Sequence, residues 1–343
     1  MIKYNLSRPI DFDPSPSPSD DRLQAYYLDA EFNDDGTVTH ANSGSLATAC
    51  RGTWKHVKNL DSWHGGSVVK VQRLVQPTTD DKSIIPPAQP KIFRAVKQLR
   101  SRQPWPSVDY WPMISRGILC MVMANVSDTI AIVRLLGWYR DRQFTYIAME
   151  YYPHGNLQMY LAASPCQEQS WARDVIRQVL GVLFELDKAS LAHRNLTLSN
   201  IVISSPLPIR VKVADFHNAK WMHEGSGLVT QIGNHPYIAP EMHNLENKAS
   251  TGYDTKIDMW ALGIILHQIL SNSHPFHNPG RLSFSETQYQ RFLDDGGQVS
   301  LDAVQGLVND DGMVLLTAML ARDANHRPTP AQALEMPWFT ATL

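Results

Sequence analysis

Cysteine is scarce in this chain of 343 residues, which carries Cys50, Cys120 and Cys166. Thiols so few and so far apart predict neither a disulfide framework nor a zinc site, because both need paired or clustered cysteines. Positive charge is not in excess either, since 31 lysines and arginines stand against 33 acidic residues, for a formal net charge of -2. This balance gives no reason to expect binding to nucleic acid or to an anionic membrane.

Long hydrophobic runs are also missing, and none approaches the length of a membrane span. The N-terminus has no apolar segment of the kind found in secretory signals. Apolar residues nevertheless make up 43% of the chain, enough for a substantial core. We therefore expect a folded intracellular protein, cytoplasmic or nuclear, that binds neither membranes nor nucleic acid.

Residues 1–22 alternate proline, serine and aspartate and offer little to bury, which predicts a flexible leader. Short apolar runs broken by glycine, asparagine and aspartate from residue 36 to Lys70 predict strands and hairpins. Two later stretches, residues 91–100 and 113–123, have helix-like spacing between clusters of proline.

The pattern is clearer after residue 130. Residues 130–137 and 144–150 predict two strands around a polar turn. Apolar residues recur at helical spacing over 171–186, which predicts a buried amphipathic helix. Residues 209–213 alternate apolar and basic side chains, so a strand should end shortly before Asp215.

Several short motifs follow one another in a fixed order. The segment HRNLTLSN at 193–200 resembles the H-R-D-L-x-x-x-N catalytic loop of protein kinases. Further kinase-like motifs are DF at 215–216, GNHPYIAPE at 233–241, DMWALG at 258–263, RPT at 327–329 and PWF at 337–339.

Together these motifs resemble the eukaryotic-type protein kinase superfamily, in its serine/threonine branch. The resemblance implies an α+β bilobal fold with a small β-rich N-lobe and a larger, mostly helical C-lobe. The expected boundaries are residues 36–149 for the N-lobe, 150–154 for the hinge and 155–343 for the C-lobe. It also implies a buried ion pair between Glu241 and Arg327.

The same resemblance implies ATP and Mg²⁺ as cofactors. Lys70 would contact the phosphates, and Gly44 would lie in the loop that covers them. Met149, Glu150 and Tyr152 would offer hinge groups to the adenine.

Within the catalytic motif, His193 and Arg194 match the kinase pattern. Asn200 and Asp215 match the residues that hold the metal ion.

Other positions depart from the pattern. Asn195 replaces the aspartate that accepts the proton of the substrate hydroxyl, and an amide has no useful basicity. Loss of such a base costs about two to four powers of ten in rate. Thr197 and Asn234 replace a lysine and a threonine that work with that base, and His217 replaces the glycine of D-F-G.

The N-lobe helix of a kinase carries a glutamate that fixes the phosphate-binding lysine. This chain has no glutamate between Glu31 and Glu150. If 93–96 aligns with the helix, Ala95 takes the glutamate's place, and if the Met113 helix aligns, Gly117 or Cys120 does. We therefore expect the lysine to be weakly held.

Three hypotheses follow. The first is a pseudokinase that binds ATP and magnesium and regulates or scaffolds a protein partner. The second is a low-activity or atypical serine/threonine protein kinase. The third is a kinase-fold transferase with other chemistry, such as AMP transfer. The sequence leaves the oligomeric state open.

Overall fold

The computed structural model describes residues 20–41, 45, 51–63, 67–75, 92–100, 111–124, 131–222, 235–243, 254–278 and 283–340. Most of the predicted leader lies outside these residues, as do Gly44 and Asn234. The chain divides into two compact units. Among the described residues, the first comprises 20–124 and 133–151, and the second comprises 131–132 and 152–340. The division between Tyr151 and Tyr152 falls within the predicted hinge segment.

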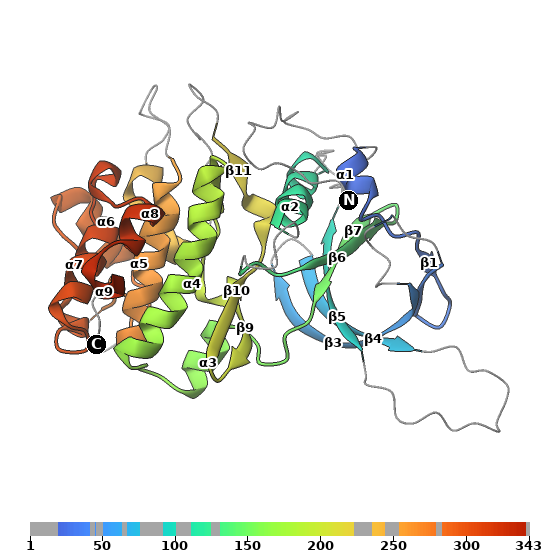
Figure 1. The fold of residues 1–343 in the computed structure, drawn as a ribbon, viewed down its shortest axis with the longest axis horizontal. Helices are drawn as coiled ribbons and strands as arrows, with labels where there is room; N and C mark the ends of the chain where they lie inside the picture. The colour runs from blue at the N-terminus through green and yellow to red at the C-terminus, as the bar shows by residue number, and fades with distance from the viewer. Residues whose placement is uncertain are drawn as a thin grey trace. The chain divides into compact units, whose positions relative to one another are not determined.

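The first unit is built on one antiparallel sheet with the strand order β1-β2-β3-β4-β5-β7-β6 (Figure 1). Its strands are β1 (Glu31–Phe32), β2 (Val38–His40), β3 (Gly52–Trp63), β4 (Ser67–Val75), β5 (Phe93–Arg100), β6 (Leu135–Arg140) and β7 (Phe144–Glu150). In the part of this unit that the structure describes, two helices accompany the sheet, α1 (Asp21–Gln24) and α2 (Trp111–Ala124). The rings of Trp111 on α2 and Trp138 on β6 pack with centroids 5.2 Å apart.

The segment after α1 joins the two ends of the sheet. The N–H of Leu28 donates to the Trp138 carbonyl at 2.8 Å, and the N–H of Trp138 donates to the Tyr26 carbonyl at 2.9 Å. Residues 26–28 lead directly toward β1, so the chain covers the otherwise open edge of β6. Only glycine fits at position 137, because a Cβ there would lie 2.8 Å from Leu28 Cδ1.

The helix predicted over 91–100 is wrong, because this stretch forms β5. The strand lies between β4 and β7, and both of its faces are largely buried. A strand buried on both faces loses the clean alternation of apolar and polar residues. The helix predicted over 113–123 is confirmed as α2, and the strand predicted over 130–137 begins later, at Leu135.

The second unit is mostly helical. Its helices are α3 (Leu157–Ala163), α4 (Gln169–Lys188), α5 (Lys256–Ser271), α6 (Glu286–Asp295), α7 (Asp310–Met319), α8 (Pro330–Leu334) and α9 (Pro337–Thr340). Helices α4 and α5 run through its core, where Figure 1 shows them side by side. The buried face predicted for α4 is confirmed, since Val175, Val179, Val182 and Leu186 are all buried.

Two short strand pairs bring the motif segments together. Strands β9 (Ile201–Pro206) and β10 (Ile209–Val213) form one antiparallel pair, which confirms the strand predicted before Asp215. Strands β8 (Leu191–Ala192) and β11 (Lys220–Trp221) form the other. The segment 193–200 follows β8, and the segment 214–219 precedes β11, so the β8–β11 pair holds both segments on the same side of the unit.

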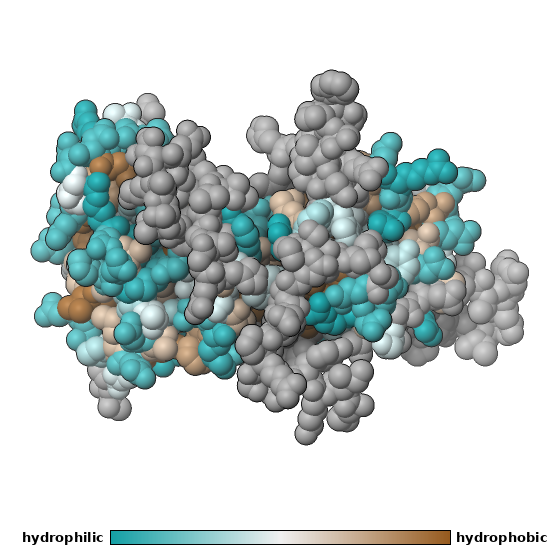
Figure 2. Space-filling model, turned by 90° about the horizontal axis from the view of Figure 1, so that it is seen from above, coloured by the Kyte–Doolittle hydropathy of each residue, from teal (hydrophilic) through white to brown (hydrophobic). Residues whose placement is uncertain are grey.

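On the face shown in Figure 2, hydrophilic side chains cover most of the coloured surface and hydrophobic residues are scattered over it. Within the described part of the chain, no helix is both long and apolar enough to cross a membrane.

Candidate active site

The catalytic-loop motif is anchored to the core by Asp258, in the first turn of α5. One carboxylate oxygen accepts the N–H of His193 at 2.7 Å, and the other accepts the N–H of Arg194 at 2.9 Å. Asp258 is 3% exposed, and this burial raises the pKa of its carboxyl to about 6 although both N–H groups and Arg194 lower it. The loop is therefore fixed by main-chain contacts that do not depend on the residue at 195.

The end of the motif is a 3-10 turn, η2 (Leu198–Asn200), capped by Thr197. The Thr197 hydroxyl oxygen accepts the N–H of Asn200 at 3.3 Å. The side-chain amide of Asn200 donates through Nδ2 to the Asn195 carbonyl at 2.8 Å. This contact orients the amide, so Oδ1 is the atom of Asn200 that can reach a ligand.

Asp215 lies beside this loop. The N–H of Ala214 donates to the Asn200 carbonyl at 2.8 Å, and the His193 ring packs edge-on against Phe216 with centroids 4.7 Å apart. Asp215 has φ 71 and Arg194 has φ 65, a left-handed conformation that costs a non-glycine residue about 1–3 kcal/mol. Such strain persists only where the surrounding contacts impose it, and here it occurs in both motif segments.

The structure brings Asn195 and Asp215 into contact. Asn195 Nδ2 donates to Asp215 Oδ2 at 3.4 Å, and His217 Nδ1 donates to Asp215 Oδ1. An aspartate at position 195 could not donate in this way, because an ionised carboxylate only accepts. Two of the departures from the kinase pattern therefore act on the same carboxylate.

Asn200 and Asp215 fit a magnesium ion by the chemistry of their donors. Both present oxygen atoms, which Mg²⁺ prefers, and Mg²⁺ is commonly held by one or two protein oxygens together with phosphates and water. Among the residues that the structure describes, no group of three His, Cys, Asp or Glu side chains could hold a metal ion by itself. Phosphates and water would have to supply the remaining ligands.

Lys70 lies in β4, where it is paired with Asn59 of β3 and Val96 of β5. Paired residues project to the same face of a sheet, so Lys70 shares a face with Val96. Lys97 is the next residue in β5 and lies on the opposite face, paired with Val69 and Ile147 and 7% exposed.

Lys97 is a second candidate for the phosphate-binding lysine, which the motifs considered in the sequence did not include. Kinases carry the phosphate-binding lysine in a V-A-I-K pattern, on the strand that precedes the N-lobe helix. Here Ala95-Val96-Lys97 lies on β5, and β5 is followed in the chain by α2. The sequence contains this A-V-K pattern. A helix predicted over 91–100, however, does not place Lys97 on a strand, so the pattern does not stand out. The sequence of α2, WPMISRGILCMVMA, contains no acidic residue.

The residues predicted for the hinge lie at the end of the first unit and the start of the second. Met149 and Glu150 end β7, and the N–H of Glu150 donates to the Arg134 carbonyl at 3.1 Å. The Tyr152 carbonyl accepts the N–H of Gly155 at 3.3 Å. Their role toward adenine stays a prediction.

The predicted pair of Glu241 and Arg327 is confirmed. Two parallel hydrogen bonds of 2.7 and 2.8 Å join the guanidinium to the carboxylate. The Arg327 side chain is fully buried and lies 5.1 Å from the Trp260 ring centroid.

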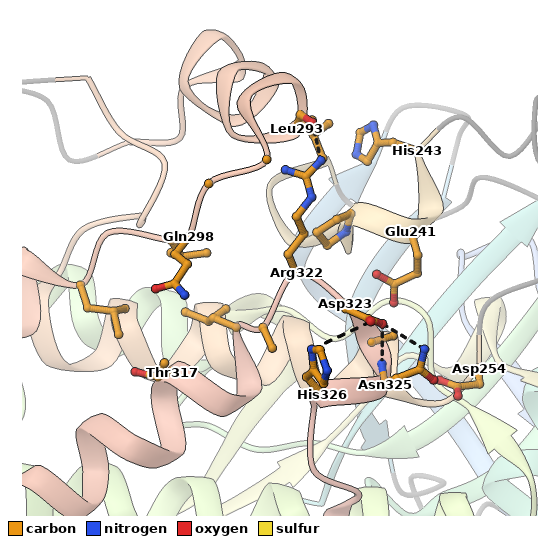
Figure 3. Close-up of a pocket in the computed structure, with 18 residues that line it drawn as sticks. Glu241, His243, Asp254, Leu293, Gln298, Thr317, Arg322, Asp323, Asn325 and His326 are labelled. Carbon is orange, nitrogen blue, oxygen red and sulfur yellow. Dashed lines mark hydrogen bonds and ion pairs between the residues drawn. The ribbon is translucent and has the colours of Figure 1, made fainter.

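A cavity of about 1020 Å³ opens in the second unit beside α6 and α7 (Figure 3). Its lining mixes polar and apolar residues, and the charged ones are Glu241, Asp254, Arg322 and Asp323. None of its lining residues belongs to the catalytic-loop segment or to 214–218. This cavity is therefore separate from the candidate active site.

Comparison with known proteins agrees with this geometry. The model of the family described as protein kinase domain matches residues 93–339. Serine/threonine-protein kinase RAD53 of Saccharomyces cerevisiae is 28% identical over 311 residues, which cover 88% of this chain and 35% of the relative. Serine/threonine-protein kinase cds1 of Schizosaccharomyces pombe is 30% identical over 196 residues, 57% of this chain and 41% of the relative.

A third relative, calcium-dependent protein kinase 29 of Arabidopsis thaliana, is 26% identical over 224 residues, 65% of this chain and 40% of the relative. The chain thus spans less than half the length of these relatives. The family match covers more than half of the chain and confirms the predicted α+β kinase fold. This chain belongs to the protein kinase domain family.

Proposed function

We propose that this chain is a serine/threonine protein kinase domain with a slow transfer step, which moves the γ-phosphate of ATP to a hydroxyl group of another protein. The serine/threonine-protein kinase names of its relatives support this hypothesis over the pseudokinase hypothesis. The retained pair of Asn200 and Asp215 and the anchored loop support it as well.

The contact between Asn195 and Asp215 carries the proposal of a slow step. Asn195 donates through Nδ2 to Asp215, so the amide is held beside the residue that would bind the metal ion. Its Oδ1 can accept a hydrogen bond from a substrate hydroxyl and orient it. It cannot take the proton, and the absence of a general base costs about two to four powers of ten in rate. Positioning alone then sustains the transfer.

We assign the remaining roles residue by residue. Lys97, rather than Lys70, contacts the nucleotide phosphates. Asn200 and Asp215 hold the magnesium ion, which neutralises charge on the phosphates when it is bound. His193 and Arg194 keep the loop on Asp258 through their main-chain N–H groups.

A transfer assay with labelled ATP tests this proposal. Purified protein is incubated with a serine/threonine substrate mixture, with and without magnesium, and with label in either the α- or the γ-phosphate. We expect slow, magnesium-dependent transfer of the γ-label, which Asp215→Ala abolishes. The control is Asp294→Ala, which removes an exposed carboxylate on α6 and should transfer as the wild type does.

Two results would contradict the proposal. Transfer of the α-label would favour AMP transfer instead. Absence of any transfer, together with a thermal shift on ATP binding, would favour the second candidate function below.

The second candidate is a regulatory or scaffolding module that binds a protein partner without transferring phosphate. One observation favours it: both oxygens of the Asp215 carboxylate are contacted by side chains of this chain, Asn195 and His217. A carboxylate occupied in this way binds a metal ion less readily.

A further inference from the structure

We propose that His217 is an internal competitor for the divalent cation: its ring N–H occupies Oδ1 of Asp215 and must withdraw before a metal ion can bind there. The inference rests on the proposed function, because it concerns the metal site of that reaction. It assigns a role to a residue that stands where the kinase pattern has a glycine with no side chain.

The His217 ring and the Asp215 carboxylate are in direct contact. His217 Nδ1 and Asp215 Oδ1 are within hydrogen-bonding distance. A carboxylate oxygen only accepts, so the ring nitrogen donates, and a neutral ring with its proton on Nδ1 is sufficient. The two side chains are 23% and 12% exposed, so water competes little for the bond.

The local backbone holds the His217 ring beside Asp215. His217 lies in the 3-10 turn η3 (Phe216–Asn218), and Asp215 is the residue that precedes it. Phe216 is buried against His193, and the N–H of Ala219 donates to the Phe216 carbonyl at 3.0 Å. The backbone of the turn is therefore held on both sides of His217, and a rotamer change of the His217 or the Asp215 side chain is enough to separate the two groups.

The second oxygen of the Asp215 carboxylate is held less closely. Asn195 Nδ2 reaches Asp215 Oδ2 at 3.4 Å, which is long for a hydrogen bond to a carboxylate. The ring of His217 contacts the other oxygen, Oδ1, so an incoming cation must displace the ring to reach that atom. A hydrogen bond to a charged group is strong enough to weaken cation binding by about ten- to a hundred-fold.

An alternative role for His217 is that of a metal ligand. The donor set speaks against it, because Mg²⁺ prefers oxygen ligands, and the Nδ1 that faces Asp215 is occupied by its own proton. The two roles predict opposite effects of removing the ring. Loss of a competitor tightens cation binding, whereas loss of a ligand weakens it.

Binding of Mn²⁺ to the full chain tests the proposal, with free Mn²⁺ measured by electron paramagnetic resonance in the presence of a non-hydrolysable ATP analogue. We expect His217→Ala to lower the dissociation constant for Mn²⁺ by about ten- to a hundred-fold. His217→Phe keeps a ring of similar volume but has no N–H, and it should tighten binding in the same direction. The control His326→Ala removes an exposed ring near Asp323 and should leave the constant unchanged.

Either variant alone is sufficient for the test if the other fails to fold. Unchanged or weaker Mn²⁺ binding in a folded variant would overturn the inference. Failure of the proposed function looks different: no variant would transfer the γ-label, whatever its affinity for Mn²⁺.

Discussion

At the scale of single residues, buried histidines of the second unit contribute to the response of stability to acid. The His274 ring donates from Nε2 to the Pro236 carbonyl at 2.8 Å and accepts the N–H of Phe276 at Nδ1, at 3.1 Å. One ring nitrogen therefore donates and the other accepts, which only the neutral ring can do. Burial lowers the pKa of His274 to about 4, and burial lowers that of His267 to about 4 as well.

These two histidines predict loss of stability as the pH falls from about 6.5 toward 4. Between these pH values the two histidine rings bind protons in the unfolded chain but not in the folded protein, so folding becomes less favourable. Asp258 acts in the opposite direction, because burial raises its pKa to about 6 and the folded protein then takes up a proton first. Two histidines outweigh one carboxyl, and the net free energy of unfolding should fall.

Urea unfolding at pH 7 and pH 5 measures this effect. His274→Gln keeps a donor for the Pro236 carbonyl but does not titrate. The loss of stability between the two pH values should be about 2 kcal/mol smaller in this variant. His326→Asn, at an exposed ring, should leave the loss unchanged. A loss in His274→Gln equal to that of the wild type would contradict the assignment.

Single residues also show how far the sequence could predict the site. Asn195, Asn200 and Asp215 could be singled out by motif, and in the structure Asn195 contacts both of the others, whereas their roles toward ATP and magnesium stay predictions. The contact between His217 and Asp215 could not be predicted, because a ring two residues along the chain reaches the carboxylate only in the turn observed here.

At the scale of elements, the pair of Glu241 and Arg327 joins the segment before α5 to the segment before α8. Arg327 also donates from Nε to the Ala321 carbonyl at 2.8 Å. Removing one partner of a buried pair leaves the other charge without compensation, which costs about 3–5 kcal/mol.

Glu241→Gln should therefore lower the free energy of urea unfolding by about 3 kcal/mol. The matched control is Glu185→Gln, which breaks the exposed contact with Lys188 on α4 and should cost less than about 1 kcal/mol. Equal losses in the two variants would show that burial does not strengthen the pair.

The burial of β5 explains why the sequence predicts a helix over 91–100. Strand β5 lies between β4 and β7 in the sheet, and its apolar or long side chains are largely buried on both faces. The order of apolar and polar residues along β5 therefore does not distinguish a strand from a helix. The pairing of Lys97 with Val69 and Ile147 shows that the segment is a strand. Helix α4 was predictable because just one of its faces is buried.

At the scale of the whole chain, the family match begins at residue 93, yet four strands of the first unit precede it. The segment 26–28 closes this sheet against β6, more than a hundred residues later in the sequence. No local pattern in the sequence predicts this pairing.

Gly137→Ala tests the closure of the sheet. The added Cβ would lie 2.8 Å from Leu28 Cδ1 and 2.9 Å from the Tyr26 carbonyl oxygen, at a φ of +156. Steric strain of this kind costs about 1–3 kcal/mol, and the thermal midpoint should fall. The control Gly181→Ala lies on α4 with open space around it and should stabilise the helix by about 0.5–1 kcal/mol. A midpoint unchanged in Gly137→Ala would contradict the closure.

The central claim is that the chain transfers the γ-phosphate slowly because Asn195 is not a base. The most direct test is the initial rate of γ-label transfer by the wild type and by Asn195→Asp, each compared with Asp215→Ala as background. We predict that the rate of the wild type exceeds the background rate, and that Asn195→Asp transfers the γ-label about ten- to a hundred-fold faster than the wild type. This gain is smaller than a full general base contributes, because Thr197 still replaces a lysine. Equal rates in the wild type and Asn195→Asp would contradict the account.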